Sequence, residues 1–376
     1  MPRVSVIVPV FNGIRYLPEF FESLAAALPE DSEVILVDDA STEAVYDTFP
    51  ERLGGAPVVR LRNERNLGCA AAKNRGFQVA TGDVLIHLNS DLVLDSRCLT
   101  AMVDVIARRD DVGIVGSKLV FPTTGLVQHV GMTFGNHTTH HVYFELPADH
   151  PLSNKSRDVQ ITTGATVAMS RRVLGRIGLL GESYFNHSDD TDHCLRAVRE
   201  GYRNVVAAES VAYHWESVSG PTRFARIRQS EALFWATWGS HFAVDLDRFV
   251  DEALDHLVDA IPGIETTPFE ILNLSRGADD AIVLDCLSRR WPSSRQRVRH
   301  YRQMNNASDR LWLPILLPHW IAREPAPFIY LVDHYRELEE NARWFEMRRA
   351  TVEHELVVDL TGVALLTSDV VPERGQ

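Results

Sequence analysis

The sequence has 376 residues, a formal net charge of -13 at pH 7 and a hydrophobic content of 45%. This length accommodates two ordinary domains, or one domain with a large appendage, and the composition is that of a globular protein. The acidic balance argues against a general nucleic-acid-binding protein, which normally carries a basic patch.

The cysteines and the apolar runs indicate in which cellular compartment the protein is expected. Cys69, Cys98, Cys194 and Cys286 are scattered without metal-ligand spacing, so they indicate reduced, buried thiols rather than a disulfide framework. The chain leads directly from Met1 into a strand pattern, so no signal peptide is expected. No apolar run reaches the ~20 residues that cross a bilayer. We expect a cytoplasmic protein that can still associate with the inner face of a membrane.

Apolar runs typical of β-strands alternate with helical patterns over the first 116 residues. This alternation predicts an α/β fold in which a mostly parallel sheet is covered by helices on both faces. Strands are expected at 4–10, 34–37, 58–61, 84–88 and 113–116, and helices at 16–28, 68–79 and 99–108.

The pattern changes after residue 116 and again near residue 222. Beyond that point the sequence predicts mainly helices. We therefore expect one domain over 1–222 and a helical C-terminal region over 223–376. Between the two changes, helices are expected at 170–177 and 190–200, and short strands at 205–207 and 211–214.

Polar side chains follow two of the expected strands. Asp38 and Asp39 end the second strand, and Asn89, Ser90 and Asp91 follow the fourth. Ligands of open α/β sheets bind in the crevice at the carboxyl ends of the strands. We therefore expect these side chains to share a site for a nucleotide and its metal ion.

Seven short motifs follow one another between residues 3 and 220. In this order they resemble the family 2 glycosyltransferases. The resemblance implies the GT-A fold, which is an α/β unit that binds nucleotide-diphosphate sugars, and transfer of the sugar to an acceptor hydroxyl. The motifs are Val4 to Asn12 (ending Pro-Val-Phe-Asn), Val37 to Thr42, Asn63 to Gly68, Leu88 to Asp91, Thr163 to Ala165, Ser188 to Asp192 and His214 to Ser217.

The resemblance also implies a donor side. Asp39 is expected to accept the imide N–H of a uracil or thymine ring, which implies a UDP- or dTDP-sugar. From the residues alone, solvated carboxylates of a βα loop are the favoured interpretation of the Asp38-Asp39 pair, and the resemblance reverses this preference. Gly164 would let backbone approach the sugar or acceptor closely, and Lys73 is either a donor contact or a solvated helix charge. The other donor-side candidates are Pro9, Asn66, Gly68, Asn89 and Ser90.

The metal motif of the family is Asp-X-Asp, whereas this chain has Asn89-Ser90-Asp91. Mn²⁺ or Mg²⁺ can be held by few carboxylates together with phosphates and waters, so Asp91 is expected as a direct ligand. Asn89 retains an amide that can hydrogen-bond the sugar or ribose. The resemblance makes His214 a second candidate ligand, although a lone histidine is more often a packed or surface residue.

An acidic run, Asp189-Asp190-Thr191-Asp192, opens one expected helix. Negative charge in a first helical turn complements the helix dipole, which is the structural interpretation. The family pattern Glu-Asp-X-Asp instead implies that Asp190 is the general base of an inverting transfer, taking the proton of the acceptor hydroxyl. Asp189 then stands where Glu is usual, and Asp192 caps the helix or orients loops.

Several alternatives stay open. The histidines at 129, 137, 140 and 141 favour a mobile polar loop over a zinc site. The acceptor could be a glycan, a lipid-linked saccharide or a small metabolite. The resemblance makes 1–222 the nucleotide-sugar-binding catalytic domain, and 223–376 would serve as an acceptor lid or in oligomerisation. Peripheral membrane contact and homo-oligomer formation are both compatible with the C-terminal composition. A non-catalytic nucleotide-sugar-binding or scaffold protein is the alternative function. No G-x-G-x-x-G follows the first strand, which excludes a dinucleotide-binding dehydrogenase.

Overall fold

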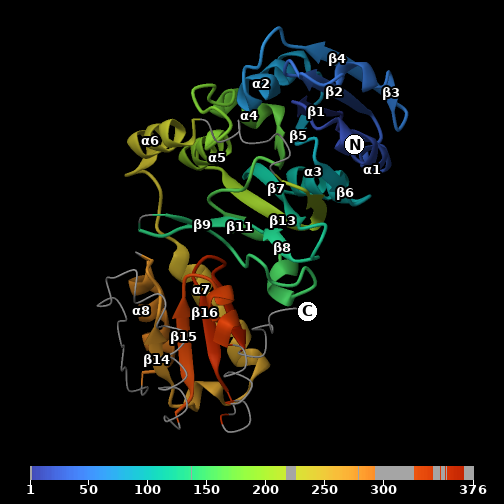
Figure 1. Ribbon diagram of the computed structural model, residues 1–376. Helices are drawn as coiled ribbons and strands as arrows, with labels where there is room; N and C mark the ends of the chain where they lie inside the picture. The colour runs from blue at the N-terminus through green and yellow to red at the C-terminus, as the bar shows by residue number, and fades with distance from the viewer. Residues whose placement is uncertain are drawn as a thin grey trace. The chain divides into compact units, whose positions relative to one another are not determined.

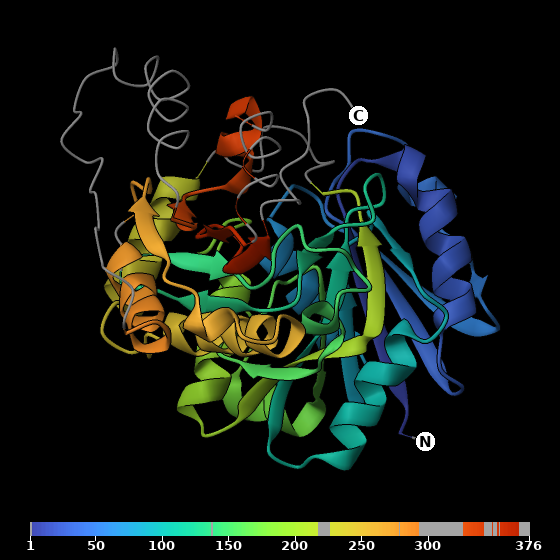
Figure 2. The ribbon, with the colours of Figure 1, turned by 90° about the horizontal axis from the view of Figure 1, so that it is seen from below.

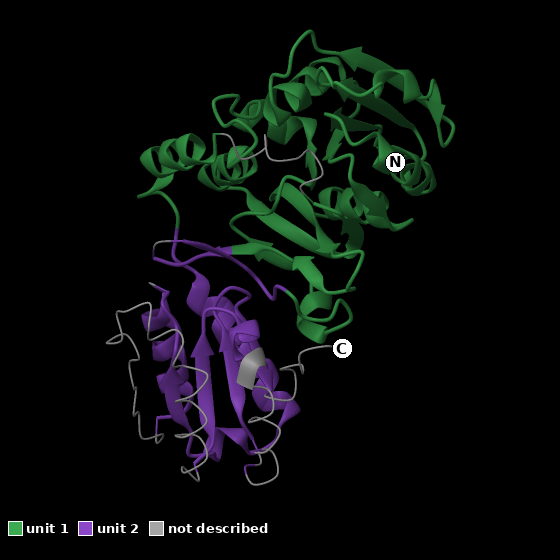
Figure 3. Ribbon diagram, viewed as in Figure 1, with its two compact units in different colours: residues 1–132, 145–242 green, residues 133–144, 243–376 purple. Residues whose placement is uncertain are grey.

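The computed structural model describes residues 2–136, 138–216, 226–277, 279–292 and 326–341, together with 348, 352 and 354–367. Figure 3 shows its two compact units: unit 1 comprises residues 1–132 and 145–242, and unit 2 comprises 133–144 and 243–376. His137, Ser217 and part of the C-terminal region expected to be helical lie outside the described residues. Within these ranges, no helix is long and apolar enough to cross a membrane.

The large sheet of unit 1 confirms the expected α/β class (Figure 1). Its strand order is β11-β13-β7-β12-β5-β1-β2-β4-β3, and β6 and β8 pair with β13 and β7. Strand β1 pairs in parallel with β2 and β5, β2 with β4, and β7 with β13, whereas β12 runs antiparallel to β5 and β7. The strands are β1 (Val4–Val10), β2 (Ser32–Asp38), β3 (Arg52–Leu53), β4 (Ala56–Arg62), β5 (Val84–Leu88), β6 (Leu92–Leu94), β7 (Val112–Val120), β8 (Val127–His129), β11 (Arg157–Val159), β12 (Thr166–Ser170) and β13 (Arg203–His214).

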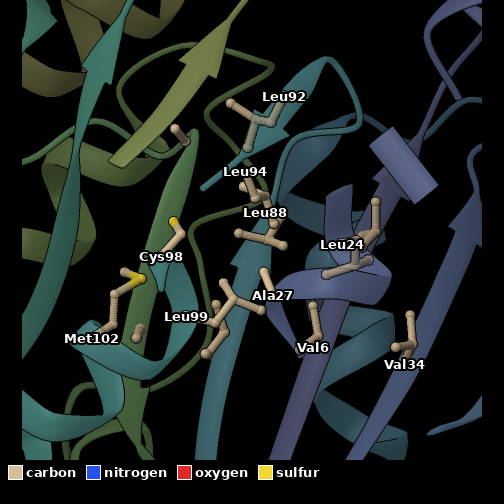
Figure 4. Packing of buried hydrophobic residues seen from close by; sticks show 14 of the residues in the cluster. Val6, Leu24, Ala27, Val34, Leu88, Leu92, Leu94, Cys98, Leu99 and Met102 are labelled. Atoms are coloured by element: carbon tan, nitrogen blue, oxygen red, sulfur yellow. The ribbon is translucent and has the colours of Figure 1, made fainter. Parts of the chain in front are cut away.

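One face of this sheet packs against two helices, α1 (Leu17–Ala27) and α3 (Cys98–Arg108). Every residue of β1 is buried, as expected for a parallel strand covered on both faces. Because side chains alternate along a strand, Val6 faces the same core as Leu24 and Leu99, which Figure 4 shows close together. The helices of this layer can be followed in Figure 2 from the blue of α1 to the teal of α3.

The opposite face carries α2 (Cys69–Val79), α4 (Arg171–Ile177) and α5 (Asp189–Arg199). Helix α2 packs directly on β1, and a Cβ added at Gly76 would collide with the side chain of Ile7. The close approach of this helix to the sheet therefore depends on a glycine. Helix α2 begins at the carboxyl edge of the parallel strands, and α5 opens at the same cavity (below).

Unit 1 continues past the boundary expected at residue 222. Helix α6 (Ile227–Trp238) belongs to it. Trp238 is buried, and its indole N–H donates to Oδ1 of Asp192 on α5 at 2.9 Å. This contact explains why the domain boundary falls after the helix rather than before it.

Unit 2 adds a small sheet that the sequence did not predict to the expected helices of the C-terminal region. It contains a four-stranded sheet in the order β14-β15-β16-β17, with the first three strands parallel and the last antiparallel. These strands are buried but only four or five residues long, and periodicity cannot separate such short apolar runs from helix segments. The elements are β14 (Glu270–Asn273), β15 (Phe328–Val332), β16 (Leu356–Asp359), β17 (Ala364–Thr367), α7 (Leu246–Ala260) and α8 (Asp280–Arg290).

Short elements complete the described chain. Strands β9 (Met132–Phe134) and β10 (Thr139–His141) pair with each other. The 3-10 helices are η1 (Ile14–Tyr16), η2 (Tyr46–Thr48), η3 (Pro151–Asn154), η5 (Ile264–Thr266) and η7 (Tyr335–Asn341).

Candidate active site

Unit 1 contains a cavity of about 540 Å³ where β1 and β5 end. Parallel strands bring their carboxyl ends to one edge, and the final residue of β13, His214, reaches this region by pairing with Leu92 just after the β5 end. The cavity brings together most of the residues expected from the sequence. Those that line it are Pro9, Asp39, Asn66, Lys73, Asn89, Ser90, Asp91, Gly164, Asp190 and His214.

Asp38 and Gly68, both expected on the donor side, are not among the lining residues. Asp38 is fully buried, accepts the backbone N–H of Ser41 at 2.8 Å and pairs with Arg62 at 3.2 Å. The structure therefore gives Asp38 a role in fixing the loop after β2. Gly68 has φ of +94°, which favours glycine, and its N–H donates to Oδ2 of Asp39 at 2.8 Å.

Asp39 is 3% exposed and holds the loop that precedes α2. Its carboxylate accepts from the side-chain amide of Asn63 at 2.7 Å and from the backbone N–H of Leu67 at 3.0 Å, besides that of Gly68. Hydrogen bonds to an ionised carboxylate are about twice as strong as neutral ones. Asp39 thus shapes one wall of the cavity while also lining it.

Lys73, Gly164 and Asp190 form a connected group. The Lys73 ammonium is 2% exposed and donates to the carbonyl of Gly164 at 3.1 Å, and the N–H of Gly164 donates to Oδ2 of Asp190 at 2.6 Å. A Cβ on Gly164 would lie 2.9 Å from Cβ of Asp190, so the close approach that this glycine permits is to Asp190. The other oxygen of Asp190 accepts the N–H of Thr191 at 2.8 Å, which leaves the carboxylate held at both ends.

Burial shifts the pKa values of Lys73 and of its acidic neighbour Asp189. Desolvation lowers the pKa of Lys73, but Cys69, Asp189 and Asp190 together raise it above its ordinary value. Desolvation raises the pKa of Asp189 to about 6, against the opposing effect of Lys73. Oδ2 of Asp189 is buried with no hydrogen-bond partner. The site therefore holds one buried cation that interacts electrostatically with two adjacent carboxyl groups.

Asp91 and His214 face each other at the cavity wall. They are 7% and 5% exposed, and Nε2 of His214 lies 3.3 Å from Oδ1 of Asp91. Nε2 is buried without a hydrogen-bond partner. A carboxylate suits Mg²⁺ or Mn²⁺, and an imidazole is a ligand of several divalent transition metals. These two side chains therefore fit a divalent cation whose other ligands are phosphates and waters. Within the described residues, no group of three or more His, Cys, Asp or Glu side chains could hold a metal ion alone.

The histidine-rich stretch is not one loop. His129 ends β8, is fully buried and contacts Oγ1 of Thr162 through Nε2 at 3.0 Å. His140 lies in unit 2, where its Nε2 is 3.0 Å from Oδ2 of Asp279. The expected mobile polar loop is therefore wrong for the described histidines, because short strands and buried contacts fix them.

Residues 5–178 match the family model described as Glycosyl transferase family 2. This segment, a little under half of the chain, is a glycosyl transferase family 2 segment. The uncharacterized protein y4gI of Sinorhizobium fredii is 29% identical over 259 residues, which are 65% of this chain and 28% of that protein. The O-antigen biosynthesis protein RfbC of Myxococcus xanthus is 31% identical over 253 residues, 64% of this chain and 19% of that protein.

The chain matches less than a third of the length of either of these two relatives. Among solved structures, that of GalNAc-T7 with UDP, GalNAc and Mn²⁺ is 16% identical to this chain with a TM-score of 0.49, covering 70% of this chain and 58% of that chain. The match to the family model over residues 5–178 confirms the resemblance that the ordered motifs indicated.

The cavity also includes residues that sequence reasoning did not assign to the site. Asn186 has a positive φ of 56° and accepts the N–H of Cys69 at 2.8 Å, which caps α2 from a distant loop. The guanidinium of Arg226 lies over the ring of Phe185 at 4.8 Å. Cys69 directly follows the Asn63 to Gly68 motif as the first residue of α2, whereas Phe185, Asn186 and Arg226 stand in none of the motifs. The unassigned lining residues include Cys69, Phe185, Asn186 and Arg226.

Proposed function

We propose that the chain is a metal-dependent, inverting glycosyltransferase that moves a sugar from a UDP- or dTDP-sugar to an acceptor hydroxyl. The observation that carries the proposal is the cavity, where Asp39, Asp91, Asp190 and His214 come from four separate segments and line the same space. The family 2 match over residues 5–178 supports glycosyl transfer as the reaction.

Asp39 is the proposed contact for the pyrimidine base. Three N–H donors of the loop before α2 already use Asp39, and the N–H of Leu67 is shared between both carboxylate oxygens. Asp39 also lines the cavity, so the imide N–H of uracil or thymine would be its fourth donor. Asn66, Asn89 and Ser90 supply additional polar groups to the proposed donor side.

Asp190 is the proposed general base. It takes the proton of the acceptor hydroxyl as the hydroxyl oxygen bonds to the anomeric carbon. The bond from that carbon to the diphosphate oxygen breaks on the opposite side, so the nucleoside diphosphate leaves and the configuration inverts. Gly164 and Thr191 hold the two carboxylate oxygens in place, which supports this role through preorganisation. A cation held by Asp91 and His214 would neutralise the charge that develops on the diphosphate.

The acceptor is proposed to be a growing glycan, with a lipid-linked saccharide or a small metabolite as alternatives. The name of the Myxococcus xanthus relative, an O-antigen biosynthesis protein, supports the glycan. We assign acceptor recognition or oligomerisation to unit 2, because the lining of the donor cavity comes from unit 1 among the residues that the structure describes. A peripheral membrane contact would accompany a lipid-linked acceptor.

A donor panel tests the proposal. The protein is mixed with UDP-, dTDP- and GDP-sugars in the presence of Mn²⁺, Mg²⁺ or EDTA, with thermal shift reporting binding and nucleotide release reporting donor hydrolysis. A metal-dependent shift with one pyrimidine nucleotide sugar, accompanied by nucleotide release, is the expected result. Binding without release under any condition would favour the non-catalytic scaffold instead.

Asp190→Asn separates binding from catalysis. Loss of a general base costs about 10²–10⁴-fold in rate, so nucleotide release should fall by this factor while the donor-induced thermal shift persists. Asp192→Asn is the matched control on the same helical turn, because Asp192 pairs with Arg196 and Trp238 and does not line the cavity. If the Asp190 variant released nucleotide as fast as the parent chain, Asp190 would not be the general base.

A further inference from the structure

We propose that Gln128, on β8, is a positioning residue that sets the tautomer of His214, so that Nε2 presents its lone pair beside Asp91. This inference rests on the cation of the proposed function. Gln128 is 6% exposed and its Oε1 lies 2.7 Å from Nδ1 of His214.

The orientation of the Gln128 amide follows from its other contacts. Its Nε2 lies 3.3 Å from Oε2 of Glu216 and 3.5 Å from the backbone carbonyl of His214. Both of these oxygens are acceptors, so the donating end of the amide must face them. The acceptor end, Oε1, therefore faces the imidazole, so Nδ1 of His214 must carry a proton.

This assignment decides the state of the other ring nitrogen. A neutral imidazole has one N–H and one lone pair, so a protonated Nδ1 leaves Nε2 of His214 as an acceptor. Nε2 is buried, has no hydrogen-bond partner and lies 3.3 Å from Oδ1 of Asp91. Two buried acceptors thus face each other across a distance that a shared cation would bridge favourably.

The strand that carries Gln128 is built irregularly at this point. Leu119 on β7 pairs with His129, and Val120 pairs with Val127, so Gln128 is an extra residue of β8 opposite two consecutive residues of β7. Such a β-bulge re-aims a side chain and is frequent beside active sites. Partners of this kind fix the tautomer and orientation of a metal-binding histidine, and their loss typically costs about 10–100-fold in metal affinity.

The test uses one disruptive variant and one exchange. Gln128→Leu removes the acceptor for Nδ1, so the ring can place its proton on Nε2 and donate to Asp91. The double variant Gln128→Glu, Glu216→Gln exchanges the amide and the carboxylate, which keeps an acceptor for Nδ1 and a donor for the new Glu side chain with the same total charge. Glu216 is exposed, so water can solvate the exchanged group.

Two measurements are made on the full chain. Nitrogen-15 NMR of histidine-labelled protein without metal reports which ring nitrogen of His214 is protonated, with His214→Asn identifying the signal. Electron paramagnetic resonance titration with Mn²⁺ in the presence of UDP reports metal affinity. We expect an Nδ1–H tautomer in the parent chain and in the exchange variant. In Gln128→Leu we expect an Nε2–H tautomer and a 10- to 100-fold weaker Mn²⁺ affinity.

An Nε2–H tautomer in the parent chain would overturn the inference without any variant. Unchanged tautomer and affinity in Gln128→Leu would overturn it as well. If the parent chain binds no Mn²⁺ with UDP, the cation of the proposed function is lost. The tautomer spectra then still decide whether Gln128 sets the protonation of His214.

Discussion

Replacing Asp189 by Asn should remove a loss of stability that the parent chain undergoes as the pH rises. Asp189 opens α5, is 6% exposed and has one carboxylate oxygen without a hydrogen-bond partner. Desolvation raises the pKa of this carboxyl from 3.8 to about 6, and the neighbouring Asp190 acts in the same direction. The folded protein therefore holds a proton on Asp189 over a pH range in which the unfolded chain has released it.

The change in the free energy of unfolding with pH follows from the linkage between proton binding and folding. A raised folded-state pKa means that the stabilisation is complete below the unfolded pKa and is lost as the pH rises through the folded one. A difference of about 2 pH units at about 1.4 kcal/mol each gives roughly 3 kcal/mol lost between about pH 4 and about pH 6. Asn does not titrate, so the free energy of unfolding of the variant should not fall in this way. Relative to the parent chain, the variant should therefore become more stable as the pH rises from about 4 to about 6.

Urea unfolding at a series of pH values measures the difference, followed by the tryptophan fluorescence of the chain, to which Trp238 beside α5 contributes. Asp104→Asn is the control, because Asp104 is an exposed carboxylate on α3, paired only at the surface with Arg108. The free-energy difference between the Asp189 variant and the parent chain should rise with pH and then level off. A free-energy difference that stays constant from about pH 4 to about pH 7 would refute the conclusion that burial raises the pKa of Asp189.

Two further predictions concern packing and the donor loop. Gly76→Ala should destabilise unit 1, because overpacking against Ile7 costs about 1–3 kcal/mol and helix propensity returns only about 1 kcal/mol. Gly175→Ala is its control in urea unfolding and should be neutral or stabilising, since an added Cβ there meets nothing within 4 Å. Asp39→Asn should weaken UDP binding at least ~10-fold in calorimetry, because an amide cannot accept all the N–H groups of the 63–68 loop. Unchanged UDP affinity would remove Asp39 from the donor site.

Much of the cavity could be predicted because strand ends are readable in a sequence. The apolar runs of β1, β2 and β5 are continuous, and parallel pairing aligns Val10 with Asp38. Polar residues directly after such runs must therefore gather at one edge. This reasoning brings Asp39, Asn89 and Asp91 to the same cavity, although it could not separate Asp39 from Asp38.

What distinguishes Asp38 from Asp39 is the direction of each side chain. Asp38 is the last residue of β2 and pairs with Arg62, which β4 brings alongside it in parallel register. Asp39 is the next residue, and its carboxylate turns to the loop before α2. Adjacent residues of a strand point to opposite sides, but which side faces the ligand depends on the neighbouring strands. The sequence alone does not contain that information in readable form.

Gln128 illustrates the same limit more sharply. In the sequence it is one polar residue in a short β-like piece, Val127-Gln128-His129, and no motif or charge draws attention to it. Its position opposite His214 depends on the irregular register between β7 and β8 and on β13 ending beside both. A one-residue change in register would turn the amide away from the imidazole. The protonation of a candidate metal ligand is thus governed by a bulge in a strand far from it in sequence, which is why a ligand set can be predicted from motifs while the groups that orient it cannot.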